Sequence, residues 1–378
     1  MTELPQYLNP RTDSVWPVGE SLWCAPDDGG YVNLTPGNGL DQKSIETSLP
    51  SLWRYRDAIR LPGTEVASLG EGWTPMVTGR WAGQDISMKM EYLMPSGSFK
   101  DRGTAVMMNY LKQVGVTTIL EDSSGNAGSS VATYSAYLGF DSRIFVPAQA
   151  PLAKRRQMAA LGADVVAVEG SRDDVAAAAR REAESRFYAG HNLQPYFLEG
   201  TKTLAFEIWE QFGFDLPDAI VIPMGQGSNV MGCHIGFDEL RRAGMIDRLP
   251  RIYAIQAENA APYYAAWAAN SETPVEIEAK PTIADGIASS KPVRLREVLA
   301  ALRETGGDAI AVSEIEIRAS LGELCRIGFF VEPTTAAGAA GLTRLIEDGS
   351  IRDDERVVLI LTGSGLKAVD VIGETLQL

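Results

Sequence analysis

The chain has 378 residues, of which 45% are hydrophobic, and its formal net charge is −15. Such a chain can bury the core of one large domain or of two ordinary domains. The acidic residues are spread along the sequence, which argues against nucleic acid or an anionic membrane as a partner. No apolar run approaches the length of a membrane span, and the polar first residues do not resemble a signal peptide.

Few cysteines and histidines are present, and this limits the chemistry that the chain can perform. Cys24, Cys233 and Cys325 are isolated in the sequence, which is typical of a protein from the reducing cytoplasm. His191 and His234 are too few for a His-rich metal centre, and they leave few ways to build a Ser-His-Asp triad. Lysine, carboxylate or hydroxyl groups are therefore expected to transfer protons.

Strand and helix patterns alternate from residue 86 onward. The first strands are predicted over 86–92, 117–121, 143–147 and 164–169, with helices that begin near residues 99, 126, 152 and 171. A second set of strands is predicted over 218–224, 251–256, 309–312 and 356–362. Single helices between strands imply right-handed crossovers and parallel sheets. We therefore predict an α/β protein with two doubly wound open domains, preceded by an irregular N-terminal part.

Segment 96–103 (Ser-Gly-Ser-Phe-Lys-Asp-Arg-Gly) is a loop of small residues that places Lys100 at the start of a predicted helix. The helix macrodipole favours the neutral form of a lysine amine at that position. A neutral amine can form a Schiff base, so Lys100 is where pyridoxal phosphate (PLP) would be attached. The alternative is a solvated lysine followed by a surface pair, Asp101 and Arg102.

Two further loops of small residues follow predicted strands. Segment 123–130 (Ser-Ser-Gly-Asn-Ala-Gly-Ser-Ser) opens a helix whose first amides can hold a carboxylate, although an ordinary helix cap has the same pattern. Segment 225–229 (Gly-Gln-Gly-Ser-Asn) can cradle a phosphate at a helix N-terminus, or can be a simple tight turn. It does not match the dinucleotide-binding pattern, because Val230 stands where the third glycine would be.

Segment 361–367 (Leu-Thr-Gly-Ser-Gly-Leu-Lys) follows an apolar predicted strand. The hydroxyl of Thr362 can form a hydrogen bond with a heterocyclic nitrogen without protonating it. A PLP ring with a neutral nitrogen is a weaker electron sink, which favours elimination and replacement on the amino-acid side chain over transamination. The alternative is a turn with a capping serine.

These motifs together resemble PLP enzymes of the tryptophan-synthase-β type (fold type II), and most closely the threonine synthase family. The resemblance rests on segments 68–75, 98–103, 198–203 and 361–367, and it spans about residues 50 to 370. It implies that Lys100 is catalytic and that the cofactor is bound by Lys100, Phe99, Asn126, Gly225, Gln226, Gly227, Ser228, Asn229 and Thr362. It implies that the substrate is bound by Ser98, Ser123, Ser124, Gly125, Ala127, His191, Asn192, Phe197 and Lys202.

The resemblance also implies a domain organisation. A large PLP-binding domain is expected over residues 1–84 and 198–378, with an irregular segment at 1–50, and a small α/β domain over 85–197. Segment 24–31 resembles a degenerate zinc ribbon, in which Cys24 alone should bind no zinc. We expect a cytoplasmic homodimer that acts on a small amino acid, with no metal, nucleic acid or membrane as a partner.

Segment 191–200 (His-Asn-Leu-Gln-Pro-Tyr-Phe-Leu-Glu-Gly) departs from the family pattern. Threonine synthases hold the phosphate of their substrate with an Asn-Ser pair and an arginine just before the Glu-Gly motif. In this chain His191-Asn192 and Phe197 occupy those positions, and a phenyl ring cannot offer paired donors to a dianion. His191 would compensate only when protonated, so such activity should fall above about pH 6.5.

Three functions fit these observations. The first is threonine synthase, which converts O-phospho-L-homoserine and water to L-threonine and phosphate. The second is a related lyase that acts on an unphosphorylated β-substituted or hydroxy amino acid, as a dehydratase, an ammonia-lyase or an enzyme of β-replacement. The third is a non-catalytic amino-acid-binding module. The lysine, the glycine loop and the terminal hydroxyl together argue against the third, because binding alone needs no Schiff-base lysine.

Overall fold

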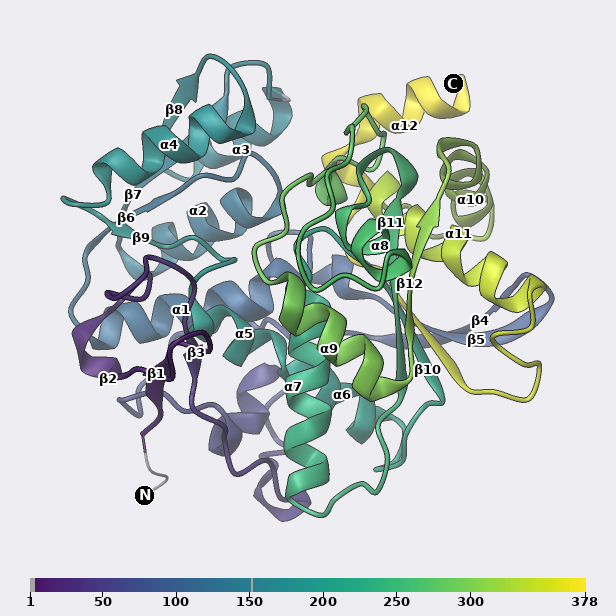
Figure 1. Ribbon diagram of the computed structural model, residues 1–378, viewed down its shortest axis with the longest axis horizontal. Helices are drawn as coiled ribbons and strands as arrows, with labels where there is room; N and C mark the ends of the chain where they lie inside the picture. Colours follow the sequence, from purple (N-terminus) through teal and green to yellow (C-terminus); the bar gives the residue numbers. More distant parts are fainter. Residues whose placement is uncertain (1–3, 151) are drawn as a thin grey trace. The chain divides into compact units, whose positions relative to one another are not determined.

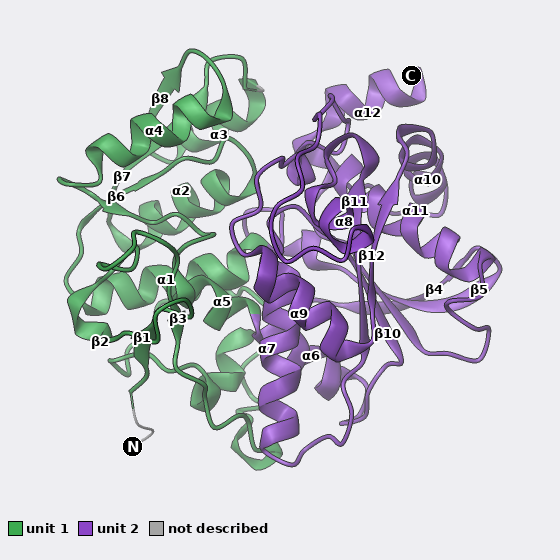
Figure 2. Cartoon of the chain, viewed as in Figure 1, with its two compact units in different colours: residues 1–72, 100–201 green, residues 73–99, 202–378 purple. Residues whose placement is uncertain are grey.

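The computed structural model describes residues 4–150 and 152–378 of the chain (Figure 1). Contacts between residues divide it into two units, which are coloured separately in Figure 2. Unit 1 consists of residues 1–72 and 100–201, and unit 2 of residues 73–99 and 202–378. This grouping differs from the predicted domains, in which residues 1–84 belong with 198–378.

Unit 1 is built around a four-stranded parallel sheet with the strand order β8-β7-β6-β9. The strands are β6 (Thr118–Glu121), β7 (Asp141–Pro147), β8 (Asp164–Val168) and β9 (Phe187–Tyr188). The helices are α1 (Lys100–Gln113), α2 (Asn126–Leu138), α3 (Leu152–Ala160), α4 (Arg172–Glu182) and α5 (Pro195–Thr201). The predicted starts of α1 to α4 are confirmed to within one residue. Strand β9 is not predicted, because two residues are too few to show an alternating pattern.

The N-terminal part of unit 1 is more regular than its sequence suggests. It forms a small antiparallel sheet of β1 (Gln6–Leu8), β2 (Val15–Pro17) and β3 (Asn33–Leu34), followed by short 3-10 helices. Tyr7 of β1 is completely buried, and its ring packs edge-on against Tyr110 of α1 with centroids 6.4 Å apart. Tyr110 in turn stacks on Tyr196 of α5 at 3.8 Å. This shared core explains why the N-terminal segment groups with α1 and α5.

Unit 2 contains a six-stranded sheet with the order β12-β11-β10-β13-β5-β4, in which β4 alone runs antiparallel to its neighbour. The strands are β4 (Met76–Trp81), β5 (Gln84–Lys89), β10 (Ala219–Pro223), β11 (Arg251–Ala257), β12 (Asp308–Val312) and β13 (Val357–Ile360). The helices are α6 (Thr203–Gln211), α7 (Ser228–Arg242), α8 (Pro262–Ala268), α9 (Leu295–Thr305), α10 (Glu314–Arg326), α11 (Pro333–Glu347) and α12 (Val369–Leu376).

The predicted strand over 86–92 is assigned to the wrong sheet. It corresponds to β5, which pairs in parallel with β13 and through a hairpin with β4, whereas the sequence pattern groups it with the strands of unit 1. Ala82 and Gly83 form the hairpin turn with φ of 49° and 85°, which suits a two-residue turn of type I′. The end of the predicted strand is instead a 3-10 turn over Glu91–Leu93.

Small residues bring helix α11 close to the centre of the unit 2 sheet. A Cβ atom at Gly341 would lie 2.5 Å from Ile255 of β11, and one at Gly338 would lie 3.0 Å from Pro223 of β10. All five residues of β10 are buried. The strand ends that carry the predicted motifs, β10 and β13, are therefore fixed by tight packing. None of the helices in the described part of the chain has the length and apolarity that a bilayer crossing requires.

Candidate active site

Lys100 is the first residue of α1, in unit 1, and its surroundings are buried. Asp101 and Arg102 have no exposed surface, and Asp101 accepts a hydrogen bond from the hydroxyl of Ser130 on α2. The alternative of a solvated lysine followed by a surface pair is therefore wrong. Burial lowers the pKa of Lys100 to about 8, and the nearby Glu121 limits the shift. Burial is thus the main cause of the lowered pKa that the sequence analysis attributes to the helix dipole.

Two glycines allow α1 and α5 to pack closely, which places the residues around Lys100. A Cβ at Gly200 would lie 2.1 Å from the carbonyl oxygen of Arg102, and one at Gly103 would lie 2.6 Å from the ring of Phe197. Any larger residue at either position would push the helices apart. The glycines of the Lys-Asp-Arg-Gly and Glu-Gly motifs therefore have a packing role that also positions Phe197.

Phe197 lies directly beside the amine of Lys100. The Lys100 Nζ atom is 5.4 Å from the centroid of the Phe197 ring, within the range of a cation–π contact. The ring of His191 packs against Phe197 at 5.4 Å, and Phe197 has no exposed surface. Phe197, at the position where the resemblance implies an arginine, is thus an apolar neighbour of the predicted catalytic lysine.

His191 is paired with a carboxyl group that the sequence analysis does not single out. Its Nδ1 atom is 3.1 Å from Oε1 of Glu121, the last residue of β6, which is completely buried. Burial, with a further contribution from Lys100, lowers the pKa of His191 well below its usual value of 6.5. His191 is therefore neutral at physiological pH, and the expected phosphate-compensating charge near pH 6.5 is not present.

The Ser-Ser-Gly-Asn loop lies in the same unit as Lys100. Asn126 is the first residue of α2, and Ala127 behind it is buried. A Cβ at Gly128 would lie only 1.9 Å from the carbonyl oxygen of Ser123, so the loop folds back over the first turn of the helix. The remaining loop residues predicted to bind substrate, Ser124 and Gly125, are partly exposed, as is Asn192.

The glycine loop over 225–229 connects β10 to α7 in unit 2. Gly227 has a φ of 86°, and a Cβ there would lie 2.5 Å from Val298, so only glycine fits. The side chain of Gln226 donates to the carbonyl of Lys291 at 2.8 Å and accepts from the amide of Val293 at 3.0 Å. Gln226 thus braces a neighbouring loop through its side chain. If Gln226 binds the cofactor as predicted, it does so through its backbone.

Two buried side chains near the ends of unit 2 strands have unsatisfied polar atoms. Asn229 is 3% exposed, and neither its amide nitrogen nor its oxygen has a hydrogen-bond partner among the described residues. The hydroxyl of Ser98 is likewise buried with no partner within residues 4–150 and 152–378. Buried polar groups in this state are rare unless they await a ligand or water. Both residues belong to the predicted site.

Thr362 follows β13 and is held in place by neighbours in unit 2. Its Oγ1 atom is 3.1 Å from Oγ1 of Thr335, and its carbonyl oxygen accepts from the amide of Phe99 at 3.0 Å. Ser98 forms a bridge with Gly363. The segment that immediately precedes Lys100 in the chain is therefore bound along the Thr362–Gly363 segment.

Lys202 has a different environment from the one predicted. Its amine forms a completely buried ion pair with Glu239 of α7 at 2.9 Å, and neither side chain is available to a small molecule in this arrangement. The pairing links the start of α6 to α7. Lys202 therefore has a structural contact where the resemblance implies substrate binding.

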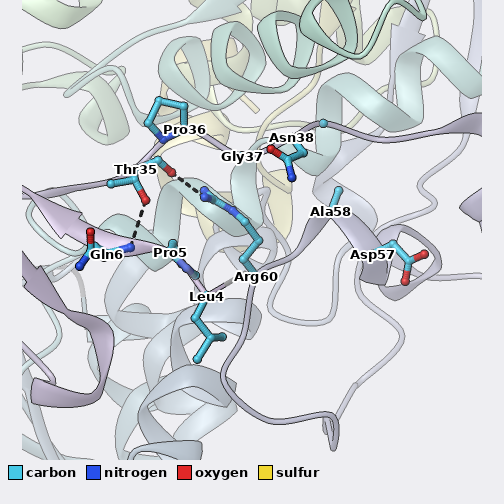
Figure 3. Close-up of a pocket in the computed structure, with 11 residues that line it drawn as sticks. Leu4, Pro5, Gln6, Thr35, Pro36, Gly37, Asn38, Asp57, Ala58 and Arg60 are labelled. Atoms are coloured by element: carbon cyan, nitrogen blue, oxygen red, sulfur yellow. Dashed lines mark hydrogen bonds between the residues drawn. The ribbon is translucent and has the colours of Figure 1, made fainter. Parts of the chain in front are cut away.

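A surface cavity of about 480 Å³ lies in unit 1, and none of the predicted site residues lines it (Figure 3). Arg60, on its wall, donates to the carbonyl oxygen of Thr35 and forms an ion pair with Glu199 at 3.0 Å. The Glu-Gly motif thus contributes Glu199 to a structural ion pair.

Comparison with known proteins identifies the family. The model of a family described as pyridoxal-phosphate dependent enzymes matches residues 67–363 of the chain. The chain belongs to the pyridoxal-phosphate-dependent enzymes. Its cofactor is PLP, as the motifs around Lys100 and residues 225–229 predict, and its family includes the threonine synthases.

Several curated relatives are threonine synthases. That of Methanosarcina acetivorans is 35% identical over 87% of this chain and 83% of that protein. That of Methanocaldococcus jannaschii is 35% identical over 84% of this chain and 81% of that protein. That of Mycobacterium tuberculosis H37Rv is 33% identical over 84% of this chain and 88% of that protein. The resemblance stated from the sequence is thereby confirmed.

Solved structures confirm fold type II. An L-serine ammonia-lyase from Rhizomucor miehei superposes with a TM-score of 0.71 at 21% identity, covering 80% of this chain and 97% of the other. A threonine deaminase isoform from Solanum lycopersicum superposes with a TM-score of 0.70 at 22% identity, covering 92% of both chains. At these identities the likeness establishes the fold alone.

The residues present fit PLP. The side-chain amide of Asn229, in the first turn of α7, has no hydrogen-bond partner within the described part of the chain and suits a phosphate group, since both amide protons and the helix N-terminus are donors. Lys100 has the lowered pKa that a covalent attachment point needs. The Thr362 hydroxyl suits a ring nitrogen. The donor set in each unit is therefore chemically complementary to part of the cofactor.

Glu121 is the residue that sequence reasoning misses. The predicted strand over 117–121 ends at Glu121 and the predicted loop motif begins at Ser123, so neither Glu121 nor Asp122 is predicted to belong to the site. The sequence does contain a signal for Glu121, which is the acidic pair directly before a loop of small residues. A carboxylate at the end of a buried parallel strand is costly without a partner, so such a pair indicates a specific contact.

Proposed function

We propose that the enzyme catalyses elimination or replacement on the side chain of a small L-amino acid, and that it is a threonine synthase. As such it is a carbon–oxygen lyase that converts O-phospho-L-homoserine and water to L-threonine and phosphate. Support comes from relatives of that name, which are 33–35% identical to this chain over at least 84% of its length.

The observation that carries the reaction class is the hydroxyl pair of Thr362 and Thr335. Their Oγ1 atoms are 3.1 Å apart, and Thr362 is 3% exposed. A hydroxyl, unlike a carboxylic acid, does not protonate a ring nitrogen. PLP bound against Thr362 supplies a moderate electron sink, which suits elimination and replacement better than transamination.

The chain's own residues have distinct proposed roles. Lys100 holds the cofactor covalently and moves protons at the substrate carbons, since its pKa of about 8 lies near physiological pH. The amides at the start of α2, with Ser123 and Ser124, hold the substrate carboxylate. Asn126 donates to the phenolic oxygen of the cofactor. The loop over 225–229, with Asn229, binds its phosphate.

One observation favours the second candidate, a lyase for an unphosphorylated substrate. Phe197 and His191 occupy positions where the threonine synthase pattern has phosphate-binding groups, and both lie at Lys100. Phe197 is apolar, and the low pKa of His191 keeps it neutral. A phosphate dianion placed beside these two residues would lose its hydration without gaining a cation from them.

A substrate panel separates the two candidates. Purified full-length protein with PLP is offered O-phospho-L-homoserine, L-threonine, L-serine and β-substituted amino acids, and the release of phosphate, ammonia and keto acid is followed. Phosphate and threonine formed in equal amounts from the first substrate establish the threonine synthase. Keto acid and ammonia from serine or threonine, with no turnover of the phosphorylated substrate, establish the alternative lyase.

A substitution tests the role of Thr362. In Thr362→Asp a carboxyl group would protonate the ring nitrogen and strengthen the electron sink, so side reactions such as transamination should increase while elimination slows. Thr335→Ser, which keeps the hydroxyl at the neighbouring position, is the matched control. An unchanged product distribution in Thr362→Asp would show that this side chain does not meet the ring.

We further propose that the enzyme is a cytoplasmic homodimer. Exposed apolar side chains on unit 2, including Leu366 at 77% and Val369 at 51%, provide surface for a contact between subunits. The scattered cysteines agree with a reducing compartment. Light scattering on the full-length protein tests the dimer, and a monomeric mass at micromolar concentration would exclude it.

A further inference from the structure

The side chain of Tyr263 reaches from α8 to the loop over 225–229, within unit 2. Tyr263 is the second residue of α8 and has no exposed surface. Its hydroxyl donates a hydrogen bond to the backbone carbonyl oxygen of Gln226 at 3.0 Å. A buried tyrosine from one element thus contacts the backbone of the loop between β10 and α7.

Tyr263 is held in place by Gln256, a completely buried residue of β11. The Oε1 atom of Gln256 accepts hydrogen bonds from the backbone amides of Tyr263 and Tyr264, each at 3.0 Å. Its Nε2 atom donates to the carbonyl oxygen of Met224, which directly follows β10, at 3.4 Å. One buried side chain therefore contacts both the start of α8 and the end of β10. The position of the Tyr263 hydroxyl relative to the loop is fixed by these contacts.

The loop needs such a contact because of the glycine that it contains. Gly227 has a φ of 86°, and a Cβ there would lie 2.5 Å from Val298, so no other residue fits. Glycine restricts its own backbone less than any other residue does. The peptide group between Gln226 and Gly227 can therefore rotate unless another group holds it. Its carbonyl oxygen is the atom that Tyr263 contacts.

The direction of this carbonyl group determines the direction of the Gly227 amide. The peptide group is trans, and in a trans peptide the carbonyl group and the N–H group that follows it point in opposite directions. With the oxygen held by Tyr263, the N–H group of Gly227 points away from that side chain. A rotated peptide group would present its oxygen there instead, and an anion would be repelled.

A second observation indicates that the loop binds an anion. Asn229 is 3% exposed, and neither polar atom of its side chain has a hydrogen-bond partner among residues 4–150 and 152–378. The positive end of the helix dipole at the start of α7 also favours a negative charge. The side chain of Gln226 is already bonded to the carbonyl of Lys291 and the amide of Val293. Backbone amides and Asn229 are therefore the donors that the loop offers to a phosphate group.

We propose that Tyr263 is a positioning residue for the phosphate group of the cofactor. By holding the carbonyl oxygen of Gln226, its hydroxyl keeps the amide of Gly227 directed towards the phosphate. Tyr263 acts through the backbone, and no covalent bond forms or breaks in this role. The inference rests on the proposed assignment of the loop over 225–229 to the cofactor phosphate, and it is independent of which amino acid is the substrate.

A comparison of PLP with pyridoxal, which lacks the phosphate group, tests this role without any substrate. The dissociation constants of both compounds are measured by absorbance on the full chain freed of PLP, in wild type and in Tyr263→Phe. The variant removes one hydroxyl, so its affinity for PLP should fall about tenfold, while its affinity for pyridoxal should stay within about twofold. Equal losses for the two compounds, or no loss for either, would overturn the proposal.

Tyr264→Phe is the matched control. Tyr264 is 40% exposed, and its backbone amide is held by the same Gln256, so this variant should keep both affinities. Phosphorus NMR gives a second readout, which reports on the phosphate group directly. The resonance of bound PLP should move towards that of free PLP in Tyr263→Phe and should stay in place in Tyr264→Phe. An unmoved resonance in Tyr263→Phe would show that the loop keeps its direction without the hydroxyl, and the proposal would be wrong.

The wild-type affinities distinguish a failure of this inference from a failure of the proposed site. If wild type binds PLP no more tightly than pyridoxal, the loop does not hold the phosphate group, and the inference fails together with that assignment. If wild type prefers PLP and Tyr263→Phe keeps the whole preference, the assignment stands and the role of Tyr263 is wrong. Neither result depends on the substrate panel, because no substrate is present.

Discussion

Lys89 in unit 2, which is completely buried, and Lys100 in unit 1, which is partly buried, show how differently a folded chain can treat a lysine. Lys89 is completely buried at the end of β5, and its ammonium group contacts the Glu207 carboxylate, the carbonyl oxygen of Thr74 at 2.6 Å and Oε1 of Gln211 at 2.8 Å. Three acceptors match its three N–H donors. Lys100 instead lies against the Phe197 ring, with Glu121 nearby.

The difference shows that burial alone does not make a lysine reactive. Around Lys89, the Glu207 carboxylate also accepts hydrogen bonds from the amides of Trp73 and Thr74. The ion pair therefore joins the loop before β4 to α6. That arrangement stabilises the charged form of the amine. Around Lys100 the lowered pKa makes the neutral form accessible, which a nucleophile and base requires.

The largest expected effect is on catalysis. Lys100→Ala should reduce turnover by at least about 10³-fold, because the attachment point of the cofactor and the proton-transferring group are lost together. Its free energy of unfolding should change by less than about 1 kcal/mol, since a desolvated charge is removed. Near-normal turnover by this variant would remove Lys100 from the mechanism.

The opposite pattern is expected at Lys89. Lys89→Met leaves Glu207 buried without its cation, and this should cost about 3–5 kcal/mol in stability. The midpoint of urea unfolding measures the effect, and the double variant Lys89→Met/Glu207→Gln should recover part of the loss. If Lys89→Met unfolds at the wild-type urea concentration, the structural role of the ion pair is incorrect.

The stability of the PLP-free chain should depend on pH through Glu121. Its pKa is raised from 4.5 to about 8 in the folded state, so the folded chain binds more protons than the unfolded chain between these values. The resulting stabilisation is complete below about pH 4.5 and is lost as the pH rises to about 8. Urea midpoints across this range should fall less steeply in Glu121→Gln than in wild type. Equal slopes would mean that Glu121 ionises normally.

A smaller effect is expected from a new cation beside Lys100. Phe197→Arg should improve kcat/KM for O-phospho-L-homoserine by about tenfold, because the guanidinium group offers paired donors to phosphate. Phe197→Leu, which stays apolar, is the control and should give no such gain. Efficient use of this substrate by wild type, with no further gain in the arginine variant, would place the phosphate of the substrate elsewhere.

Much of the fold follows from local sequence patterns, and the exceptions depend on long-range packing. The alternation of apolar runs predicts the strands of the two large sheets except β4 and β9. No local pattern indicates that Tyr7 packs on Tyr110, since 103 residues separate them. The same limit explains β5, because its partner β13 lies far along the chain and its hairpin with β4 is marked only by Ala82-Gly83.

Some residues of the candidate site can likewise be predicted from the sequence, and others cannot. Lys100, Thr362 and the loop over 225–229 can be found from motifs, because each sits where a strand meets a helix or a turn. Lys202 also lies in a motif that resembles the family, yet only the structure reveals that it forms an ion pair with Glu239. Glu121 is overlooked because a carboxylate at the end of a strand has no meaning until its burial beside His191 is known.

Borohydride reduction of the PLP-bound protein, followed by peptide mapping, tests the central contrast most directly. Reduction fixes the cofactor to the lysine that holds it. We predict that the label is found on the peptide containing Lys100 and is absent from the peptides containing Lys89 and Lys202. A label on either of the ion-paired lysines, or none on Lys100, would contradict this account of the enzyme.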